Sequence, residues 1–250
     1  LKDDYVPFRI TLSISPTLAS MLTDELLQKR YIAHVKKMQE LAAKELDRTK
    51  RDSQFKPIVQ IGKELLDENL FDFTEIYKKN ILKGFKALEK DGYLEIITSA
   101  ATHAFLPLFE EYPKAVEAQI NTAVISHGRL FGKEPSGFWL PECGYFSGLE
   151  KYLKVNNQKY SFTAAHGVLF SSCGPQFGVY SPLTSNGVSF FGRDLQSSSA
   201  VWSGQDGYPG DQVYRDFYRD IGFDLPLGYI RPYIHDGDIR VFTGFKYYAR

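Results

Sequence analysis

The chain has very little cysteine and no excess of charge of either sign. It contains two cysteines, Cys143 and Cys173, in 250 residues, which is too few for a disulfide framework and predicts a reducing, cytoplasmic location. Lys and Arg together number 30, and so do Asp and Glu. This balance argues against a nucleic-acid partner and against binding to a membrane surface, because both need an excess of basic residues.

Long apolar runs and familiar binding motifs are also missing. No run approaches the roughly 18–20 apolar residues that a membrane span requires, and no secretory signal precedes the first expected strand. The five histidines are scattered, with no His-Glu-x-x-His or Cys-x-x-Cys motif, so we expect no metal site. Phosphate loops, dinucleotide fingerprints and Gly-x-Ser-x-Gly elbows are missing too, so we expect no cofactor and no serine nucleophile.

Aromatic residues, in contrast, are abundant at 15% of the chain, with 16 Tyr and 19 Phe. Most of these side chains are expected in the core. A cleft that binds sugars also uses such residues, because an aromatic ring can stack on a sugar face while its polar edge forms hydrogen bonds. The composition is compatible with a carbohydrate ligand and does not require one.

Strand-like segments alternate with helical segments along the chain, which predicts an α/β fold with a parallel sheet and crossover helices. Residues 171–210 lose helical periodicity and are expected to form a long functional loop around a short strand. Strands are expected at 8–15, 93–98, 137–140, 160–164, 187–191 and 239–248, and helices at 18–29, 31–50, 57–66, 74–90, 113–130, 145–155 and 213–221.

The stretch 137–145 reads Gly-Phe-Trp-Leu-Pro-Glu-Cys-Gly-Tyr and is the most informative part of the sequence. Its apolar run is typical of a buried strand, which Pro141 ends because it has no N–H to donate. Glu142 then lies at the tip of that strand, where α/β barrels and open sheets carry their chemistry. A structural ion pair is the alternative interpretation of this acid.

Polar residues follow three of the expected strands, namely His103, Glu142 and His166. In a barrel or open sheet these positions lie on one rim, so we expect a site there. Glycosyl transfer needs a second carboxylate that protonates the leaving oxygen. The later loops offer candidates that are better explained by turn or capping chemistry; these are Asp194, Asp206, Asp211, Asp236 and Asp238.

Residues 137–145 closely resemble the nucleophile motif of glycoside hydrolase family 57, in particular its members that resemble 1,4-α-glucan branching enzymes. Three other stretches agree with the same family in the same order, so the resemblance covers essentially the whole chain. They are 101–108, which resembles the second conserved region of the family, 193–203, which resembles its substrate-binding loop, and 207–224.

The resemblance implies an incomplete, distorted TIM-like (β/α)7 barrel that acts on α-1,4-glucans, such as amylose or glycogen, with retention. Glu142 would be the nucleophile that forms a covalent glycosyl-enzyme, His103 would line the donor subsite, and Arg193 and Gly210 would contact the glucan. We add three binding candidates from their residue types and positions: Trp202 and Tyr208 for stacking, with core packing as the alternative, and His166 at a strand end.

The sequence departs from the family pattern in several places. The first strand with its His-x-His motif is expected before Leu1, and the general acid, an Asp, is expected beyond Arg250. The C-terminal helical domain is missing as well. Residues 1–250 are therefore interpreted as part of a catalytic barrel domain with little turnover of its own and an open sheet edge. Gly144 stands where many members carry Ala, which we expect to be a small change.

Three functions remain open at this point. The leading hypothesis is a glucan branching enzyme, in which a 6-hydroxyl of a second glucan resolves the glycosyl-enzyme. An α-amylase-type hydrolase, in which water resolves the same intermediate, is the first alternative. A glucan-binding protein without catalysis is the second, since the general acid is not expected within these residues.

Overall fold

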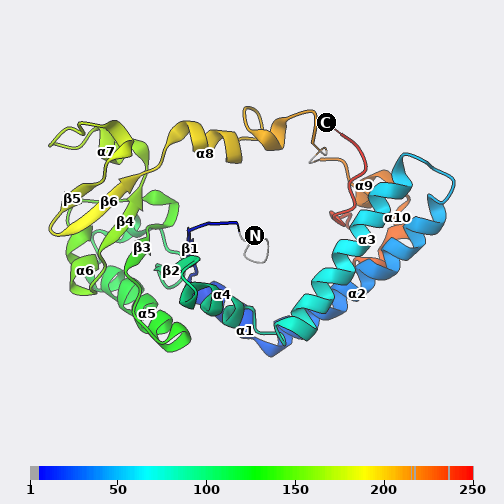
Figure 1. Cartoon of the computed structure of the whole chain (residues 1–250), viewed down its shortest axis with the longest axis horizontal. Coiled ribbons are helices and arrows are strands. Elements are labelled where there is room, and N and C mark those ends of the chain that lie inside the picture. Colours follow the sequence, from blue (N-terminus) through cyan, green and yellow to red (C-terminus); the bar gives the residue numbers. More distant parts are fainter. Residues whose placement is uncertain (1–5, 215, 217, 236, 250) are drawn as a thin grey trace. The chain divides into compact units, whose positions relative to one another are not determined.

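The computed structural model describes residues 6–214, 216, 218–235 and 237–249. The chain forms two compact units, each built from two separate stretches of sequence. Unit 1 consists of Leu1–Leu22 and Leu82–Leu195, and unit 2 consists of Thr23–Ile81 and Gln196–Arg250. The strands belong to unit 1, and the long helices α2 and α3 belong to unit 2 (Figure 1).

Unit 1 is built on a curled six-stranded sheet in the order β1-β2-β3-β4-β6-β5. All neighbouring strands run parallel except β5, which pairs with β6 in the antiparallel direction. This half-barrel confirms the prediction of an incomplete, distorted (β/α)7 barrel. The strands are β1 (Ile10–Ser13), β2 (Leu94–Ser99), β3 (Gly137–Trp139), β4 (Tyr160–Thr163), β5 (Leu183–Ser185) and β6 (Val188–Gly192).

The helices of unit 1 connect the parallel strands as crossovers. The longest, α5, ends where Gly132 adopts a left-handed conformation with φ 79°, as expected for a glycine after a helix. Pro141 ends β3 and opens a short 3-10 turn over Pro141–Cys143, as predicted. The helices are α1 (Pro16–Thr23), α4 (Ile81–Lys90), α5 (Pro113–Phe131), α6 (Leu149–Val155) and α7 (Ala165–Leu169).

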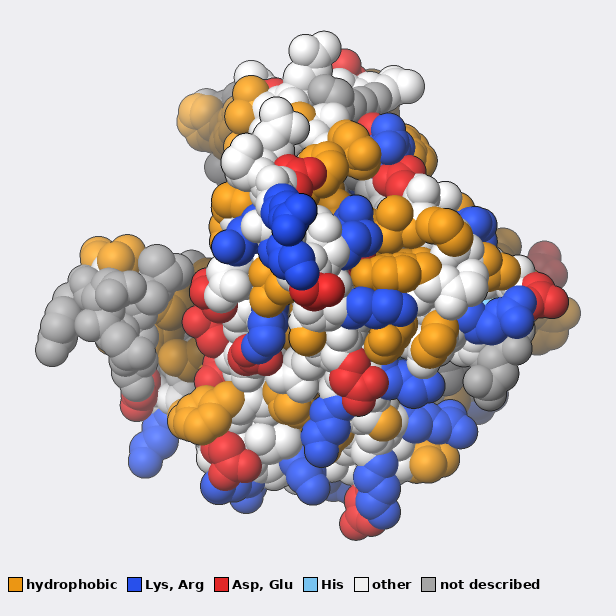
Figure 2. Space-filling view, turned by 90° about the vertical axis from the view of Figure 1, so that its right-hand side faces the viewer, with side chains coloured by type: hydrophobic (Ala, Val, Ile, Leu, Met, Phe, Trp, Pro, Cys, Tyr) orange, Lys and Arg blue, Asp and Glu red, His pale blue; other side chains and the backbone are white. Residues whose placement is uncertain are grey.

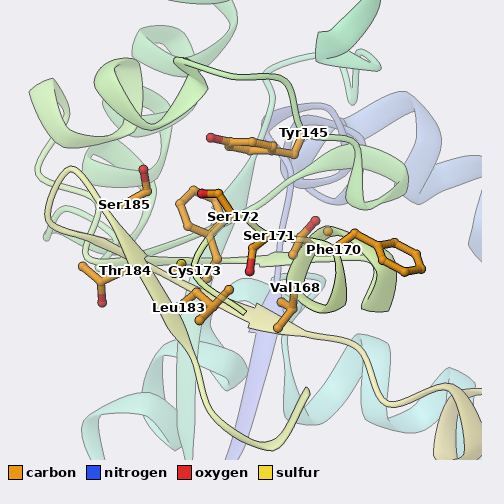
Figure 3. A pocket seen from close by; sticks show the side chains of 12 residues that line it. Tyr145, Val168, Phe170, Ser171, Ser172, Cys173, Leu183, Thr184 and Ser185 are labelled. Carbon is orange, nitrogen blue, oxygen red and sulfur yellow. The ribbon is translucent and has the colours of Figure 1, made fainter. Parts of the chain in front are cut away.

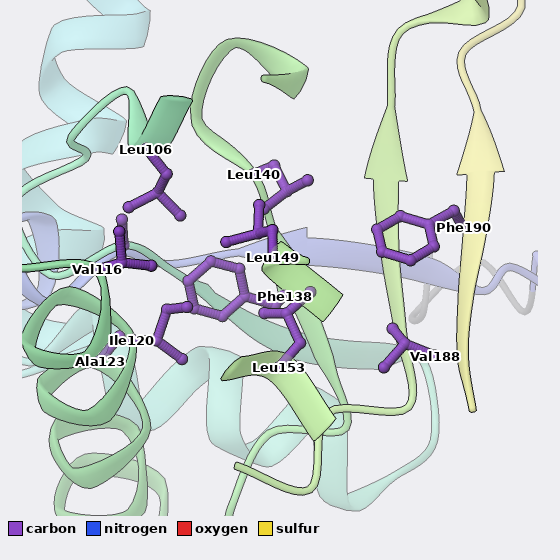
Figure 4. Close-up of a cluster of buried hydrophobic side chains, with 11 residues drawn as sticks. Leu106, Val116, Ile120, Ala123, Phe138, Leu140, Leu149, Leu153, Val188 and Phe190 are labelled. Atoms are coloured by element: carbon purple, nitrogen blue, oxygen red, sulfur yellow. The ribbon is translucent and has the colours of Figure 1, made fainter. Parts of the chain in front are cut away.

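One face of the sheet carries the hydrophobic core of unit 1. Phe138 is fully buried between side chains of α5, such as Ile120, and side chains of α6, such as Leu149 and Leu153 (Figure 4). Phe190 of β6 belongs to the same cluster. Because side chains alternate along a strand, this outer face is covered by helices while the neighbouring positions point to the opposite side.

The opposite, inner face of the sheet carries a row of aromatic rings. Trp139, Phe162 and Phe191 occupy matching positions on β3, β4 and β6. Their ring centroids lie 5.7 Å apart between Trp139 and Phe162 and 6.0 Å apart between Phe162 and Phe191. The ring of Tyr160 packs edge-on against Phe162 at 5.7 Å. Part of the aromatic excess in the sequence therefore lies on the concave side of the half-barrel.

Unit 2 is organised around the helices α2 (Glu25–Arg48) and α3 (Phe55–Phe71), which pack against each other. Its core also takes in residues from the C-terminal part of the chain, including Ile221 of α9 (Ile221–Asp224), Ile230 of α10 (Leu227–Ile230), Phe245 and Tyr247. Figure 2 shows Lys and Arg interspersed with Asp and Glu on a face of this unit. Within the described residues, no helix is long and apolar enough to cross a membrane.

Several helix boundaries differ from the predicted ones. The break expected near residue 30 lies instead at Asp24, whose side chain accepts a hydrogen bond from the N–H of Leu27 at 2.8 Å and caps α2. The helix expected over 74–90 is divided into a π-turn at Asp72–Ile76 and α4. Lys78 and Lys79 interrupt it because both adopt positive φ angles.

Three expectations in the second half of the chain are wrong. Residues 195–202 form helix α8 (Leu195–Trp202), although the sequence was expected to be loop there. The described residues of 213–220 are not helical, and the described residues of the tail 239–248 do not form a strand. In the tail, Phe245 and Tyr247 alternate because they pack on α2 and α3 rather than on a sheet.

Candidate active site

The carboxyl ends of the parallel strands of unit 1 carry the predicted polar residues. His103 follows β2, Glu142 follows β3, His166 follows β4, and Arg193 comes directly after β6. Because these strands are parallel neighbours, the four positions share one rim of the half-barrel. The prediction that strand-end residues share a rim is confirmed for His103, Glu142 and His166, and Arg193 joins them.

Glu142 is presented to solvent by a strained turn. Its φ is 53° and that of Cys143 is 56°, so two consecutive non-glycine residues are left-handed, at a cost of about 1–3 kcal/mol each. The turn is closed by hydrogen bonds from the N–H of Cys143 to the carbonyl of Leu140 at 2.9 Å and from Gly144 to Pro141 at 3.0 Å. The carboxylate is left 79% exposed.

The imidazole ring of His103 lies beside this carboxylate. Its Nε2 lies 3.9 Å from Glu142 Oε1, and its Nδ1 lies 3.3 Å from the hydroxyl of Ser99. Ser99 donates its single proton to the carbonyl of Trp139 at 2.9 Å. The Ser99 hydroxyl oxygen therefore accepts from Nδ1–H, and Nε2 is the ring nitrogen that faces Glu142.

Arg193 approaches the same turn from β6. Its guanidinium donates to Cys143 Sγ at 3.9 Å, and its backbone N–H donates to the carbonyl of Thr163 at 3.0 Å. The Thr163 hydroxyl in turn donates to the Cys143 carbonyl at 3.4 Å. Burial raises the pKa of the Cys143 thiol above its ordinary value, although Arg193 opposes the shift. Cys143 is thus a buried part of the turn.

Gly144 fits tightly in this turn, and our expectation of a small difference between Gly and Ala is wrong. A Cβ at this position would lie 2.3 Å from Cε2 of the Phe105 ring and 3.0 Å from its Cδ2. Real Cβ atoms do not approach other atoms so closely, so Phe105 would have to move. Phe105 precedes the 3-10 turn Leu106–Phe109. Because Gly144 has no side chain, the turn that carries Glu142 can pack closely against this second segment of the rim.

Sequence reasoning missed the residues that hold the site in place. The hydroxyl of Tyr145 donates to Glu150 Oε2 at 2.8 Å, and the N–H of Gly148 donates to the same oxygen at 3.0 Å. Burial, together with this carboxylate, raises the pKa of Tyr145 to about 12. Ser99 and Thr163 act on the site through contacts with residues distant in the sequence, Trp139 and Cys143. No pattern within the sequence marks such contacts.

The other predicted binding residues lie on α7 or in unit 2. The side chain of His166 is exposed on α7. Trp202, Tyr208 and Gly210 belong to unit 2, where Trp202 is 83% exposed and Tyr208 packs edge-on against Tyr214 at 5.5 Å. Core packing is therefore excluded for Trp202, and the approach of these three residues to Glu142 stays a prediction.

The loop aspartates that could supply a second carboxylate have different surroundings, and of these Asp211 shows the turn chemistry that was expected. Asp211 accepts from the N–H of Val213 at 2.9 Å, Asp194 accepts from the Tyr180 hydroxyl at 3.1 Å, and Asp238 pairs with Arg231. The N–H of Asp206 donates to the Ser203 hydroxyl at 3.0 Å. Asp236 lies outside the described residues. Within the described residues, no three His, Cys, Asp or Glu side chains converge on a metal site.

Comparison with known families identifies the origin of this arrangement. The family model described as glycosyl hydrolase family 57 matches residues 1–220. The chain belongs to this family. The matched range includes residues 137–145, which resemble the family 57 nucleophile motif and contain Glu142. It also includes His103 and Arg193.

Solved structures of two enzymes share the fold of this chain. The chain is 44% identical to the α-amylase AmyC from Thermotoga maritima, with a TM-score of 0.92 over 99% of this chain and 48% of that one. It is 28% identical to a family 57 branching enzyme from Pyrococcus horikoshii, with a TM-score of 0.77 over 88% of this chain and 43% of that one.

A curated relative points to the same group of enzymes. A 1,4-α-glucan branching enzyme of Thermococcus kodakarensis is 29% identical over 88% of this chain and 36% of its own length. The family 57 chain described here therefore spans between about a third and a half of the proteins that it matches.

Proposed function

We propose that Glu142 is the catalytic nucleophile of a retaining enzyme that acts on α-1,4-glucans and forms α-1,6 branches. The observation that carries this proposal is the strained turn that holds an exposed carboxylate at the end of β3, with Nε2 of His103 3.9 Å away. A structural carboxylate would be saturated with donors, whereas the side chain of Glu142 is 79% exposed and, among the described residues, has only His103 as an ionic neighbour.

In the proposed reaction, a Glu142 oxygen attacks the anomeric carbon of an α-1,4-linked glucose while the bond to the leaving chain breaks. The leaving oxygen takes a proton from a general acid, which we expect beyond Arg250, and a covalent glycosyl-enzyme remains. His103 would position the donor sugar, and Arg193 would line the same rim. A 6-hydroxyl of a second glucan then displaces Glu142 and gives the branch.

Hydrolysis is the second candidate, and the similarity to AmyC favours it. In this case water displaces Glu142 from the same intermediate, so both functions need the same nucleophile. The branching proposal is supported by the relatives from Pyrococcus and Thermococcus. The two outcomes differ only in what reaches the glycosyl-enzyme first, because exclusion of water decides between transfer and hydrolysis.

The nucleophile can be tested on this chain alone with a fluorinated α-maltosyl fluoride. Fluoride leaves without protonation, so labelling needs no general acid, and the ring fluorine slows release of the trapped sugar. Mass spectrometry of peptides should find the sugar on Glu142. Glu142→Gln should abolish labelling, and Glu134→Gln, which changes an exposed acid of the same unit, should not. Labelling at another residue, or none, would refute the assignment.

The fate of the intermediate requires the full-length protein that contains this chain. Incubation with amylose should produce new α-1,6 linkages in excess over new reducing ends. Reducing ends without branches would select the hydrolase. Binding of amylose without either product, together with no labelling of this chain, would select the glucan-binding protein without catalysis.

A further inference from the structure

Unit 1 contains a cavity of about 490 Å³ on the side of the β4-β6-β5 edge. This volume lies in the range of small-molecule sites, about 300–1,000 Å³. Figure 3 shows Tyr145 on one side of the cavity and Val168, Ser171 and Leu183 on the other. Its lining, named here the hydroxyl cavity, also includes Thr163, Gly167, Phe170, Ser172, Cys173, Thr184, Ser185 and Phe190.

The hydroxyl cavity lies on the outer face of the sheet, away from the aromatic row of the inner face. Phe190, which lines it, is part of the outer core cluster, and the ring of Tyr145 packs edge-on against Phe190 at 5.3 Å. The crossover from β4 to β6 has the five-residue helix α7, whereas the crossover from β2 to β3 has the 19-residue helix α5. Such a short helix leaves part of the outer face uncovered, and this is why the cavity exists.

The lining has an unusual chemistry for a gap between elements. It offers the hydroxyls of six side chains, two serines of the loop after α7 among them, and no charged side chain. Tyr145, Phe170 and Phe190 add aromatic surface, and Phe170 is 85% exposed. Hydroxyl groups beside aromatic rings match the hydroxyls and the apolar faces of a sugar ring, and the lack of charged partners disfavours an ionic ligand.

One polar group of the wall is unsatisfied. The Ser171 hydroxyl oxygen is buried and has no hydrogen-bond partner among the described residues. A buried polar group without a partner costs about 1–3 kcal/mol. Because this oxygen is closed to solvent, a ligand in the cavity would bond to it only after the Ser171 side chain rotates toward the cavity.

We propose that the hydroxyl cavity binds a neutral sugar at a site separate from the glucan that Glu142 attacks. The ligand class follows from the lining and does not rest on the proposed function. Binding would reach the nucleophile turn by two routes: Tyr145 lines the cavity and holds Glu150, and Thr163 lines it and holds the Cys143 carbonyl. An occupied cavity would therefore stiffen the turn that presents Glu142.

The test uses the thiol of Cys173, which is free and exposed in the cavity wall, whereas Cys143 is buried. Iodoacetamide should alkylate Cys173 in the folded chain, and glucose should slow this reaction. At a glucose concentration ten times the dissociation constant the rate should fall about tenfold, because only the free fraction reacts. Glucuronate, which carries the same ring with a carboxylate, should protect far less.

Variants separate this site from the rim. Ser185→Trp should fill the cavity and abolish protection by glucose, while Gln176→Trp, an exposed change on the neighbouring loop, should leave it intact. Glu142→Gln and His103→Ala should keep protection unchanged, so the proposal can hold even where trapping at Glu142 fails. The proposal is overturned by alkylation that glucose does not slow, by equal protection with glucuronate, or by protection that Glu142→Gln removes and Ser185→Trp keeps.

Discussion

Two glutamates, one in each unit, have opposite surroundings. Glu45 of α2 in unit 2 is fully buried and accepts hydrogen bonds from Arg48 at 2.8 and 2.6 Å, from the Tyr229 hydroxyl at 2.8 Å and from the Tyr247 hydroxyl at 2.8 Å. The side chain of Glu142 in unit 1 is 79% exposed on a strained turn, and Nε2 of His103 lies 3.9 Å from its Oε1.

The comparison shows how surroundings give one side chain two uses. Burial alone would raise the pKa of Glu45. The hydrogen bonds from Arg48, Tyr229 and Tyr247 lower it by more, so the net pKa lies below its ordinary value. Every oxygen of Glu45 is occupied, which joins α2 to residues far away in the sequence. The oxygens of Glu142 are available for chemistry, and the backbone strain of its turn is the cost of that exposure.

The largest effect is expected from Glu142→Gln. It should lower the rate of glycosyl transfer in the full-length protein by more than about a thousandfold, because the covalent route loses its nucleophile. The free energy of unfolding of the chain should stay within about 0.5 kcal/mol, since the side chain is exposed. Enzyme kinetics and urea unfolding measure the two effects. Normal turnover, or a large loss of stability, would reverse the comparison with Glu45.

Glu45→Gln should do the opposite, with a loss of about 2–4 kcal/mol in the free energy of unfolding. The amide keeps one acceptor oxygen but turns an NH₂ group toward donors, and Arg48 loses its counter-charge. Arg48 is 35% exposed and can recover some hydration, which limits the loss. Urea unfolding followed by tyrosine fluorescence measures the change.

The matched control for this variant lies on the same helix. Glu25 pairs with Lys29 at 4.0 Å, and both side chains are strongly exposed, so Glu25→Gln should leave the urea midpoint where it is. Labelling of Glu142 by the fluorinated donor should persist in Glu45→Gln at denaturant concentrations below the transition. An equal effect of the two variants would show that the Glu45 contacts contribute nothing special.

A third, smaller effect concerns the glycine beside the nucleophile. Gly144→Ala should cost about 1–3 kcal/mol, because its Cβ meets the ring of Phe105. Replacing Phe105 by Leu in the same chain should recover much of this loss, and a double-mutant cycle in urea measures the coupling. Gly128→Ala is the control of opposite sign: within α5 its Cβ meets nothing within 4 Å, so the change should stabilise by about 0.5–1 kcal/mol.

These effects also show what the sequence could and could not reveal. The strand before Glu142 and its end at Pro141 depend on neighbours in the sequence, and both were predicted. The contact of Gly144 with Phe105, the Ser99 bond to the carbonyl of Trp139 and the tyrosines around Glu45 join distant residues. A single sequence carries no signal for such pairs.

Local patterns also failed where packing outweighs propensity. Helix α8 is rich in serine and has no buried residue, so no apolar periodicity marks it. The tail 239–248 alternates like a strand, yet its buried residues pack on the helices of unit 2. Sequence periodicity identifies which residues are buried more reliably than it identifies the partner that buries them.

The smallest expected effect is a difference between the units in mild acid. His127 of α5 is 2% exposed, and its two ring nitrogens lie 3.0 Å from the carbonyl of Lys133 and 3.2 Å from that of Ile96. Burial lowers its pKa below the ordinary 6.5, although both carbonyls oppose the shift. The unfolded chain therefore binds more protons than the folded one below about pH 6.5, and unit 1 should lose stability there.

The slope from this single histidine should be at most about 1.4 kcal/mol per pH unit. Glu45 in unit 2 should contribute its own loss only below about pH 4.5, because its pKa is lowered and its ordinary value is 4.5. Hydrogen exchange measured between pH 7 and 4 can follow α5 and α2 separately. Amides of α5 should lose protection before those of α2, and His127→Gln should remove this order. Simultaneous loss in both helices would contradict the separate roles of the two buried groups.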